Sequence, residues 1–313
     1  RKVNIKGVFG KKSINYSLPD LFPNIDNLPN IKITNYKDFN FGGIDIVFSC
    51  LPHGKFQEDI FLKLDKKLSV IDLSGDFRLQ NISEYENWYN LTHKSKKYLK
   101  SFIYGLTEIY KKDILKAKYV SNPGCYPTSI LIPLIPLLKS KVLGDGHVVI
   151  DSKSGVSGAG KKPKVQNLFA EISENFFSYG VSKHRHYPEI CQEIKKYNDK
   201  VSLTFTPHLL PLISGLQSTI YIDKKNFDKN DLKQILKKFY KGEQFVKLYS
   251  DNRIPEIREV KNTNDIAIQI LNDYSKKKII IISCIDNLIK GAAGQAVQNM
   301  NLMFGFNESE SLI

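Results

Sequence analysis

The stretch from Tyr119 to Leu138 constrains the fold most strongly, because it predicts a strand, a tight turn and a buried helix in direct succession. A short apolar strand end at Tyr119 is followed by Asn122-Pro123-Gly124, three residue types that favour turns for different backbone reasons. Pro127 falls where the first turn of a helix tolerates proline, because its missing N–H group needs no partner there. The apolar run that follows predicts a helix packed inside the protein.

Cys125 lies at the start of this predicted helix, where we expect several backbone N–H groups to point at its sulfur. Those donors and the positive end of the helix dipole favour thiolate over thiol, so the position predicts a nucleophilic cysteine. The alternative is a structural thiol, since free cysteine is among the most buried residue types. We favour the nucleophile because of the turn that precedes it.

The composition indicates a globular protein of two domains, with 313 residues of which 42% are hydrophobic and 25% charged. No apolar run approaches the roughly 20 residues that cross a bilayer, and the first residues do not resemble a signal peptide. The four cysteines, at positions 50, 125, 191 and 284, lack metal or disulfide spacing, which predicts a reducing, cytoplasmic location. The net charge of +14 is spread over lysine doublets, so we interpret it mainly as a feature of the composition and not as a nucleic-acid-binding surface. A positive field could also attract an anionic substrate and cofactor, with RNA as a further alternative.

Two strand-to-loop junctions in the first half predict an α/β fold with a Rossmann-like parallel sheet. Residues 41–50 form a short apolar run bounded by glycines, which is typical of a strand buried on both faces. Ligands of such sheets bind at the carboxyl ends of the strands, so Pro52 and His53 are expected to border a cofactor. Further expected elements are a strand at 3–8, a helix from 54 to about 67, a strand at 69–73, a helix and loop at 84–98, and a helix at 113–118.

The second half predicts an α+β domain built on one mixed or antiparallel sheet. Its β-branched runs lie at 201–206, 215–222, 266–271 and 278–283, with an amphipathic helix at 228–240 that is capped at its start. A strand at 148–152 leads into the glycine-rich loop 154–160, and a final helix opens near residue 290. Lys161, Lys162 and Lys164 follow the glycine-rich loop and could hold phosphate or be solvated.

His184 and His186 stand two residues apart and could serve as metal ligands or in acid–base catalysis. On a strand both rings would point to one side, but no third ligand has suitable spacing, so no metal is expected. We favour acid–base catalysis, because an imidazole titrates near neutral pH and can take a thiol proton. Arg78 ends the segment 70–78, and Arg185 lies between His184 and His186. Either arginine could bind the carboxylate or the phosphate of a substrate.

Eight short segments occur in the order found in one enzyme family. They are Leu51–Gly54, Val70–Arg78, Tyr104–Leu106, Ser121–Thr128, Ser154–Gly160, His184–His186, Phe205–Leu209 and Asp286–Ala296. Their sequence and order resemble those of N-acetyl-gamma-glutamyl-phosphate reductases, NADPH-dependent enzymes of arginine biosynthesis that belong with the aspartate-semialdehyde dehydrogenases. The segments span nearly the whole chain, so the resemblance is specific.

The resemblance implies reduction of N-acetyl-L-glutamyl 5-phosphate to the semialdehyde by NADPH, through a cysteine thioester, in a homo-oligomer that is a dimer or tetramer. It makes Cys125 the nucleophile and His186 its catalytic partner, although sequence alone leaves the roles of His184 and His186 interchangeable. The expected substrate-binding residues are Asn122, Arg78, His184 and Arg185, and the expected cofactor-binding residues are Pro52, Gly155, Ser157, Gly158, Asn287 and Gly291.

The resemblance also implies a domain order: a partial NADP-binding domain at 1–124, a catalytic and oligomerisation domain at 125–285, and a C-terminal helix at 286–313. The family opens with a strand, a glycine-rich turn and a helix that hold the cofactor pyrophosphate, and no G-x-x-G-x-x-G occurs near this N-terminus. The sequence therefore looks like a fragment or a protein without this loop. Lys11 and Lys12 follow the first predicted strand, where residues that bind the cofactor 2′-phosphate would lie. The alternative is that they are a solvated pair of lysines.

Three other functions stay open at this point. The same chemistry could act on an aspartyl or aminoadipyl phosphate. A Cys–His hydrolase or acyltransferase would use the same thiol and imidazole without a nicotinamide. A non-catalytic binding subunit would account for the missing phosphate loop.

Overall fold

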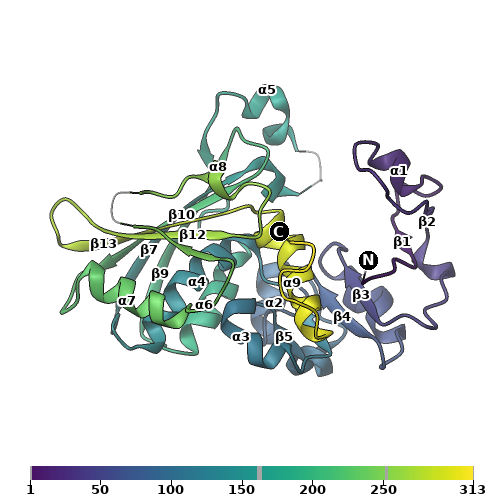
Figure 1. Cartoon of the computed structure of the whole chain (residues 1–313), viewed down its shortest axis with the longest axis horizontal. Coiled ribbons are helices and arrows are strands. Elements are labelled where there is room, and N and C mark those ends of the chain that lie inside the picture. Colours follow the sequence, from purple (N-terminus) through teal and green to yellow (C-terminus); the bar gives the residue numbers. More distant parts are fainter. Residues whose placement is uncertain (1, 161–163, 251–252, 313) are drawn as a thin grey trace. The chain divides into compact units, whose positions relative to one another are not determined.

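The computed structural model describes residues 2–160, 164–250 and 253–312, and Figure 1 shows the path of the chain. The chain divides into two compact units. The first is Arg1–Val47 with Lys63–Ser69, and the second is Phe48–Leu62 with Val70–Ile313. The second unit contains all the residues that the sequence predicts to be catalytic, substrate-binding or cofactor-binding.

The first unit contains a two-stranded parallel sheet and short helical turns. Strand β1 (Val8–Phe9) pairs with β2 (Ile33–Thr34), α1 spans Leu18–Leu21, and the 3₁₀ turn η1 spans Tyr36–Asp38. Ser17 caps α1, because its hydroxyl accepts a hydrogen bond from the backbone N–H of Asp20. The strand predicted at 3–8 is wrong except for its last residue, because residues 3–6 are exposed and have no strand partner among the described residues.

The four-stranded sheet confirms the predicted parallel, Rossmann-like sheet. Its order is β3-β4-β6-β5, formed by Ile46–Ser49, Ser69–Asp72, Tyr119–Ser121 and Phe102–Tyr104. Strand β6 runs parallel to both β4 and β5. The strand predicted at 41–50 is shorter than expected and not buried on both faces, because β3 lies at the edge of the sheet and Phe48 stays 39% exposed.

Short helices accompany this sheet, and two of them differ from the sequence predictions. The helix expected from 54 to about 67 is a π-helical turn, η2 (Phe56–Ile60), followed by a 3₁₀ turn, η3 (Phe61–Lys63). The helix expected at 113–118 is wrong in its bounds, since α3 spans Thr107–Ile114. Glu108 in its first turn forms a buried ion pair with distant Lys290, a partner that the local sequence does not reveal. The helix and loop expected at 84–98 correspond to α2 (Ile82–Tyr89) and the 3₁₀ helix η4 (Lys96–Ser101).

The buried helix predicted after the turn is α4 (Cys125–Lys139), and its apolar side chains are buried on all sides. Pro133 and Pro136 lie inside it, and each lacks the N–H group that a helix offers to the carbonyl four residues earlier. For Pro136 that carbonyl belongs to Ile132, and the Tyr240 hydroxyl donates a hydrogen bond to it instead. The second proline is therefore tolerated without leaving this buried carbonyl unpaired.

A seven-stranded sheet with both parallel and antiparallel pairs confirms the predicted mixed sheet. Its order is β11-β12-β13-β10-β7-β9-β8, with parallel pairing at β11-β12 and β7-β9 and antiparallel pairing elsewhere. The strands are β7 (Gly146–Gly155), β8 (Phe177–Ser178), β9 (Val201–Leu210), β10 (Leu216–Asp223), β11 (Val246–Leu248), β12 (Ile266–Asn272) and β13 (Lys278–Ile285).

Three helices cover one face of this sheet: α4, α6 (His186–Lys195) and α7 (Lys229–Phe239), as Figure 1 shows. The strands alternate to match, so Val148 of β7 is buried on the helix side while Val149 is half-buried on the other. Asp228 caps α7 as predicted, because its carboxylate accepts hydrogen bonds from two backbone N–H groups of the first turn.

The opposite face of the sheet carries a row of apolar side chains across four strands. Val149, Tyr221, Ile280 and Leu271 lie side by side in register on β7, β10, β13 and β12. All four are partly exposed. Contiguous apolar surface of this kind is typical of a face that packs against another chain.

The chain returns to α3 and α4 through a π-helical turn, η7 (Ile289–Ala293), and α9 (Gly294–Met303), which confirms the helix expected near residue 290. The remaining short elements are η5 (Val156–Ala159), η6 (Val165–Asn167), α5 (Phe169–Ile172) and α8 (Ile257–Val260). Among the described residues, no helix combines the length and the apolar character that a membrane span requires.

Replacing Tyr240 with Phe is expected to lower the free energy of unfolding by about 1–3 kcal/mol, because the buried Ile132 carbonyl loses its donor. The loss should be smaller in a Pro136→Ala background, where the alanine N–H can supply the helical hydrogen bond. Chemical denaturation of the four proteins in this double-mutant cycle measures both effects. Equal destabilisation in the two backgrounds would show that the Tyr240 hydroxyl does not replace the missing N–H group.

Candidate active site

The predicted turn carries Cys125 from the end of a parallel strand into a buried helix. Strand β6 ends at Ser121, Gly124 is the N-cap of α4, and Cys125 is its first residue. The backbone N–H of Asn122 donates a 2.8 Å hydrogen bond to the carbonyl oxygen of Asp72, the last residue of β4. The cysteine therefore lies at the carboxyl edge of the sheet, where α/β sheets bind their ligands.

Two glycines let other segments approach this turn more closely than a side chain would allow. A Cβ atom on Gly124 would lie 2.4 Å from Nε2 of His186, and a Cβ atom on Gly291 would lie 2.7 Å from Cβ of Cys125. Both distances are shorter than real Cβ contacts, so neither position has room for a side chain. The structure thus brings His186 and Gly291, two residues predicted for the site, against the turn from α6 and η7.

The two histidines of segment 184–186 differ in how their ring nitrogens are used. Nδ1 of His184 accepts a 3.2 Å hydrogen bond from the backbone N–H of His186, and its Nε2 lies 3.3 Å from the Tyr179 hydroxyl. Nδ1 of His186 is buried and has no hydrogen-bond partner among the described residues. His186 is therefore the histidine with an uncommitted ring nitrogen, which favours it as the acid–base residue.

Both imidazoles are uncharged at neutral pH. Burial lowers the pKa of His186 well below its usual value, and the neighbouring His184 and Arg78 lower it further. Burial and the charge of Arg185 lower the pKa of His184 to about 4. A neutral imidazole can accept a proton, so His186 is in the state that a general base needs.

Burial raises the pKa of the Cys125 thiol to about 11, although the backbone N–H of Tyr126 and the charge of Arg78 act in the opposite direction. The expectation that backbone donors hold Cys125 as a thiolate is therefore wrong for the free protein. Loss of hydration outweighs the donors and the helix dipole. A base has to remove the thiol proton, and His186 packs against the residue that precedes the thiol.

Arg78 is buried, and all three of its guanidinium nitrogens bind groups of the protein. Nε donates to the carbonyl oxygen of Asn122 at 2.7 Å, and Nη2 donates to that of Leu73 at 2.8 Å. Nη1 forms a 3.2 Å ion pair with the buried carboxylate of Glu189. The substrate-binding role predicted for Arg78 stays a prediction, and these contacts do not support it.

Arg185 differs from Arg78 in its exposure and in its hydrogen-bond partners. It is exposed, and it makes no hydrogen bond or ion pair within the part of the chain that the structure describes. Its guanidinium lies 5.8 Å from the centre of the Tyr89 ring. Arg185 lies between the two histidines in the chain, and its donors are available to an anionic substrate because no described group uses them.

Three of the residues predicted to bind the cofactor meet at the ends of β7 and β13. Oδ1 of Asn287 accepts a 2.7 Å hydrogen bond from the backbone N–H of Gly215, and its Nδ2 donates a 3.0 Å hydrogen bond to Oγ of Ser157. Gly158 is exposed beside them, and a Cβ atom there would lie 3.7 Å from Nδ2 of Asn287. Gly291 follows on η7 and contacts Cys125, so this group of residues borders the nucleophile.

The other predicted site residues have partners that the sequence does not reveal. A Cβ atom on Gly155 would lie 2.8 Å from two carbonyl oxygens of the segment before β10, so this glycine is needed for packing. The Asn122 side chain is buried and donates a 3.0 Å hydrogen bond to the carbonyl oxygen of Ala292. Pro52 is exposed in the loop after β3. The binding roles of these three residues stay predictions.

No metal site is found in residues 2–160, 164–250 and 253–312, where no group of three or more His, Cys, Asp or Glu side chains could hold an ion. The arrangement considered for a metal, with both histidines on one strand, is also not observed, because His184 lies in a loop and His186 begins α6. Of the lysines after the glycine-rich loop, Lys164 is exposed, while Lys161 and Lys162 lie outside the described residues.

Glu189 and Tyr104 belong to the site, although no sequence pattern assigned either of them a role. Glu189 is fully buried, and its Oε1 accepts hydrogen bonds from the backbone N–H of Gly124 at 2.9 Å and from the Tyr104 hydroxyl at 2.7 Å. The available signal was the spacing of His186 and Glu189, because residues three apart on a helix share a face.

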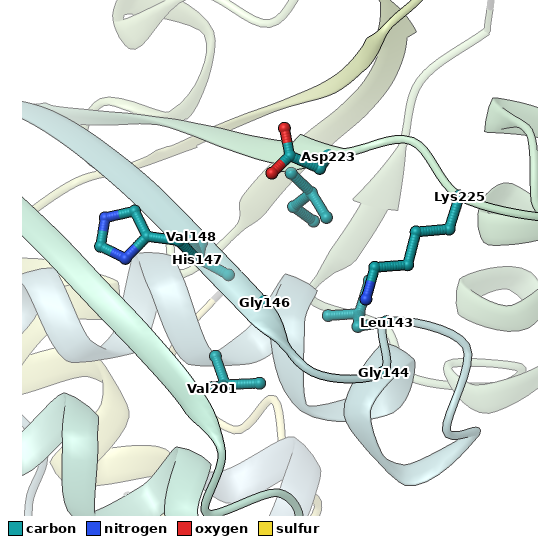
Figure 2. A pocket seen from close by; sticks show the side chains of 9 residues that line it. Leu143, Gly144, Gly146, His147, Val148, Val201, Asp223 and Lys225 are labelled. Carbon is teal, nitrogen blue, oxygen red and sulfur yellow. The ribbon is translucent and has the colours of Figure 1, made fainter.

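The small cavity in Figure 2 is not part of this site. It has a volume of about 10 Å³ and is lined by residues that include Gly146, His147 and Val201, at the beginnings of β7 and β9. The candidate site lies beyond the opposite end of β7, near Gly155. A space of this volume holds about one water molecule and no substrate.

Comparisons with known proteins match both halves of the chain. Residues 1–117 match a family described as "Semialdehyde dehydrogenase, NAD binding domain", and residues 125–287 match "Semialdehyde dehydrogenase, dimerisation domain". The fold is similar to that of aspartate semialdehyde dehydrogenase II from Vibrio cholerae, with a TM-score of 0.72 and 15% identity over 96% of this chain and 90% of that one. Fold and site thus define the class of semialdehyde dehydrogenases, with a nicotinamide dinucleotide-binding half and a half that indicates a homo-oligomer.

Two relatives narrow this class. The "Probable N-acetyl-gamma-glutamyl-phosphate reductase, chloroplastic" of Arabidopsis thaliana is 46% identical over 95% of this chain and 74% of that protein. The N-acetyl-gamma-glutamyl-phosphate reductase of Campylobacter jejuni subsp. doylei is 43% identical over 99% of this chain and 91% of that protein. The chain belongs to the N-acetyl-gamma-glutamyl-phosphate reductases of the semialdehyde dehydrogenase family, which confirms the resemblance seen in the eight segments.

Alkylation of Cys125 by iodoacetamide is expected to be slow at pH 7 and to accelerate as the pH rises toward about 11. The thiolate is the reactive form, so raising the pH through the thiol pKa increases the reactive fraction. Mass spectrometry of the Cys125 peptide at each pH measures the rate, with free cysteine as the reference thiol. A midpoint at or below about pH 8.5, the usual value for cysteine, would show that the backbone donors outweigh burial.

Proposed function

We propose that the chain reduces N-acetyl-L-glutamyl 5-phosphate to N-acetyl-L-glutamate 5-semialdehyde, with release of phosphate, using NADPH and a thioester on Cys125. The observation that carries the proposal is the packing of His186 against Gly124, directly before the thiol. An imidazole beside a cysteine at the ligand-binding edge of a sheet suits acyl transfer. The names of the 43–46% identical relatives support the acyl-phosphate substrate.

In the first step, His186 takes the Cys125 proton and the sulfur attacks the acyl carbon. The bond from that carbon to the phosphate oxygen breaks, so phosphate leaves and a thioester remains. Backbone N–H groups at the start of α4 are candidates for holding the negative oxygen that develops during attack. A thioester accepts hydride more readily than a carboxylate does, so the two steps avoid one difficult reduction.

The residues around Asn287 fit a nicotinamide group. Ser157 Oγ accepts its hydrogen bond from Asn287, which leaves the hydroxyl proton free to donate to a carboxamide, and Gly158 adds no side chain beside it. When bound, a reduced nicotinamide supplies the hydride that converts the thioester to a thiohemiacetal. His186 can then return its proton as the thiohemiacetal collapses, which releases the aldehyde and restores the thiol.

Arg185 is the proposed binding residue for a charged group of the substrate. It is exposed beside the two histidines, and its guanidinium has donors that no described group uses. A planar guanidinium can bind a carboxylate or a phosphate through two parallel hydrogen bonds. His184, which lies next to it and is engaged by Tyr179, is the proposed second contact.

We also propose the domain division, the oligomeric state and the location that the sequence predicts. These are the division at 1–124, 125–285 and 286–313, the dimer or tetramer, and the cytoplasmic location, although the Arabidopsis relative is chloroplastic. An aspartyl or aminoadipyl phosphate is the rival substrate. The hydrolase rival would turn over a thioester without oxidising NADPH.

Replacing Cys125 with Ser should lower turnover by a factor of about 10³ or more, because it removes the thiol that accepts the acyl group. His186→Gln should lower turnover by about 10²–10⁴, because it removes the base that takes the thiol proton. NADPH oxidation with N-acetyl-L-glutamyl phosphate, and separately with aspartyl phosphate, measures activity and substrate choice. Near-normal activity in Cys125→Ser would eliminate the thioester, and a preference for aspartyl phosphate would replace the proposed substrate.

The lysine pair after β1 is proposed to favour NADPH over NADH. Lys11 and Lys12 are both exposed, and a 2′-phosphate adds about two negative charges that they can attract. Replacing both with Gln should raise the KM for NADPH by about tenfold and leave the KM for NADH unchanged. The same change at Lys276 and Lys277, another exposed pair, is the control. An equal rise in KM for both cofactors would rule out 2′-phosphate recognition by this pair.

A further inference from the structure

We infer that Glu189, held by Arg78 and Tyr104, is a positioning residue that fixes the turn before Cys125 at the distance from His186 that proton transfer requires. The inference rests on the proposed role of Cys125 as the nucleophile. It gives a function to the buried ion pair between Arg78 and Glu189. The sequence analysis assigned no role to Glu189 and predicted that Arg78 binds the substrate. All the residues involved lie in the second unit.

The Glu189 carboxylate is bonded directly to the turn. Oε1 of Glu189 accepts a 2.9 Å hydrogen bond from the backbone N–H of Gly124. A hydrogen bond to an ionised acceptor is stronger and shorter than a neutral one, and here both groups are buried. The residue directly before the nucleophile is thereby tied to helix α6.

The same helix carries the base. His186 and Glu189 are three residues apart on α6, so they lie on one face of the helix. The ring of His186 packs over the α-carbon of Gly124 while Glu189 binds its N–H group. Gly124 is therefore fixed from two sides by one rigid element, and Cys125 follows it by a single peptide bond.

Arg78 joins Glu189 to the ends of two neighbouring strands. Its guanidinium binds Glu189, the carbonyl oxygen of Asn122 in the turn after β6, and the carbonyl oxygen of Leu73 after β4. Burial alone would lower the pKa of Arg78, but the Glu189 carboxylate raises it, so the guanidinium stays charged. Since each of its three nitrogens binds a group of the protein, Arg78 is placed to act on the turn.

A carboxylate with three partners suits this positioning task. Tyr104 on β5 donates its hydroxyl to Oε1 at 2.7 Å, so the carboxylate is bound by a backbone amide, a phenol and a guanidinium. Groups from three segments of the chain thus converge on the Glu189 side chain. A buried network of this kind rigidifies its surroundings when every member is paired.

Tyr104→Phe tests the inference with the least risk to folding, because it removes one hydroxyl bond to Glu189. Tyr110→Phe is a matched control, since the Tyr110 hydroxyl binds Glu193, one turn later on the same helix and away from Gly124. We expect kcat to fall by about tenfold in Tyr104→Phe with KM for the acyl phosphate unchanged, and to stay within about twofold in Tyr110→Phe. A kcat for Tyr104→Phe within twofold of the control would overturn the inference.

Glu189→Gln adds a readout that a merely structural role would not move. The Glu189 charge raises the pKa of Cys125, so its removal should shift the alkylation midpoint to lower pH. Turnover should nevertheless fall by about 10²-fold, because the thiol is more reactive but misplaced. An unshifted midpoint, or unchanged kcat, would overturn the inference. Alkylation needs no substrate, so these results stay interpretable even if the proposed reaction is wrong.

Arg78→Lys separates positioning from substrate binding. Lysine keeps the charge opposite Glu189 but cannot bind Asn122, Leu73 and Glu189 together, so kcat should fall with KM unchanged. Arg185→Lys, at the proposed substrate contact, should instead raise KM. If Arg78→Lys raises KM by as much as Arg185→Lys does, Arg78 binds the substrate and the inference fails.

Discussion

The close contact at Gly124 is the constraint on which the rest of the site depends. The imidazole of His186 occupies the place where any other residue would have its Cβ atom, and the N–H group of the same glycine is hydrogen-bonded to Glu189. Strand β6 and helix α4 fix the turn from within the chain, and α6 fixes it from outside. A side chain at Gly124 would therefore separate base from nucleophile even if both were intact.

Burial of the thiol and the two imidazoles favours their uncharged forms, and this determines how the site can react. Burial raises the pKa of Cys125 and lowers those of His184 and His186, so the thiol is protonated and the imidazoles are neutral in the free protein. This state differs from a permanent thiolate–imidazolium pair, and it keeps the thiol unreactive until a base acts on it. Arg185 stays outside this buried region and offers its charge to an incoming anion.

The sequence predicted best those features that arise within a few neighbouring residues. The short connection at Asn122-Pro123-Gly124, the apolar run of α4 and the cap of α7 are local, and the structure has all three. The β-branched runs likewise predicted the strands of the mixed sheet, whose bounds the structure extends by a few residues.

Features that depend on distant residues could not be predicted in this way. The first turn of α3 carries Glu108, which pairs with distant Lys290, and β3 is partly exposed because it is an edge strand. The Arg78–Glu189 pair joins segments more than 100 residues apart, so Arg78 resembled a free anion-binding residue in the sequence. The sequence predicted a lowered pKa for Cys125, whereas burial raises it. The cost of burying a charge depends on the whole fold and not on the helix start alone.

The proposed thioester on Cys125 is tested most directly by trapping it. The protein is mixed with N-acetyl-L-glutamyl phosphate without a nicotinamide, quenched in acid, digested and analysed by mass spectrometry. If Cys125 carries the acyl group, the peptide that contains it will bear an N-acetylglutamyl group that hydroxylamine removes. Release of phosphate with no adduct on that peptide would contradict this role of Cys125.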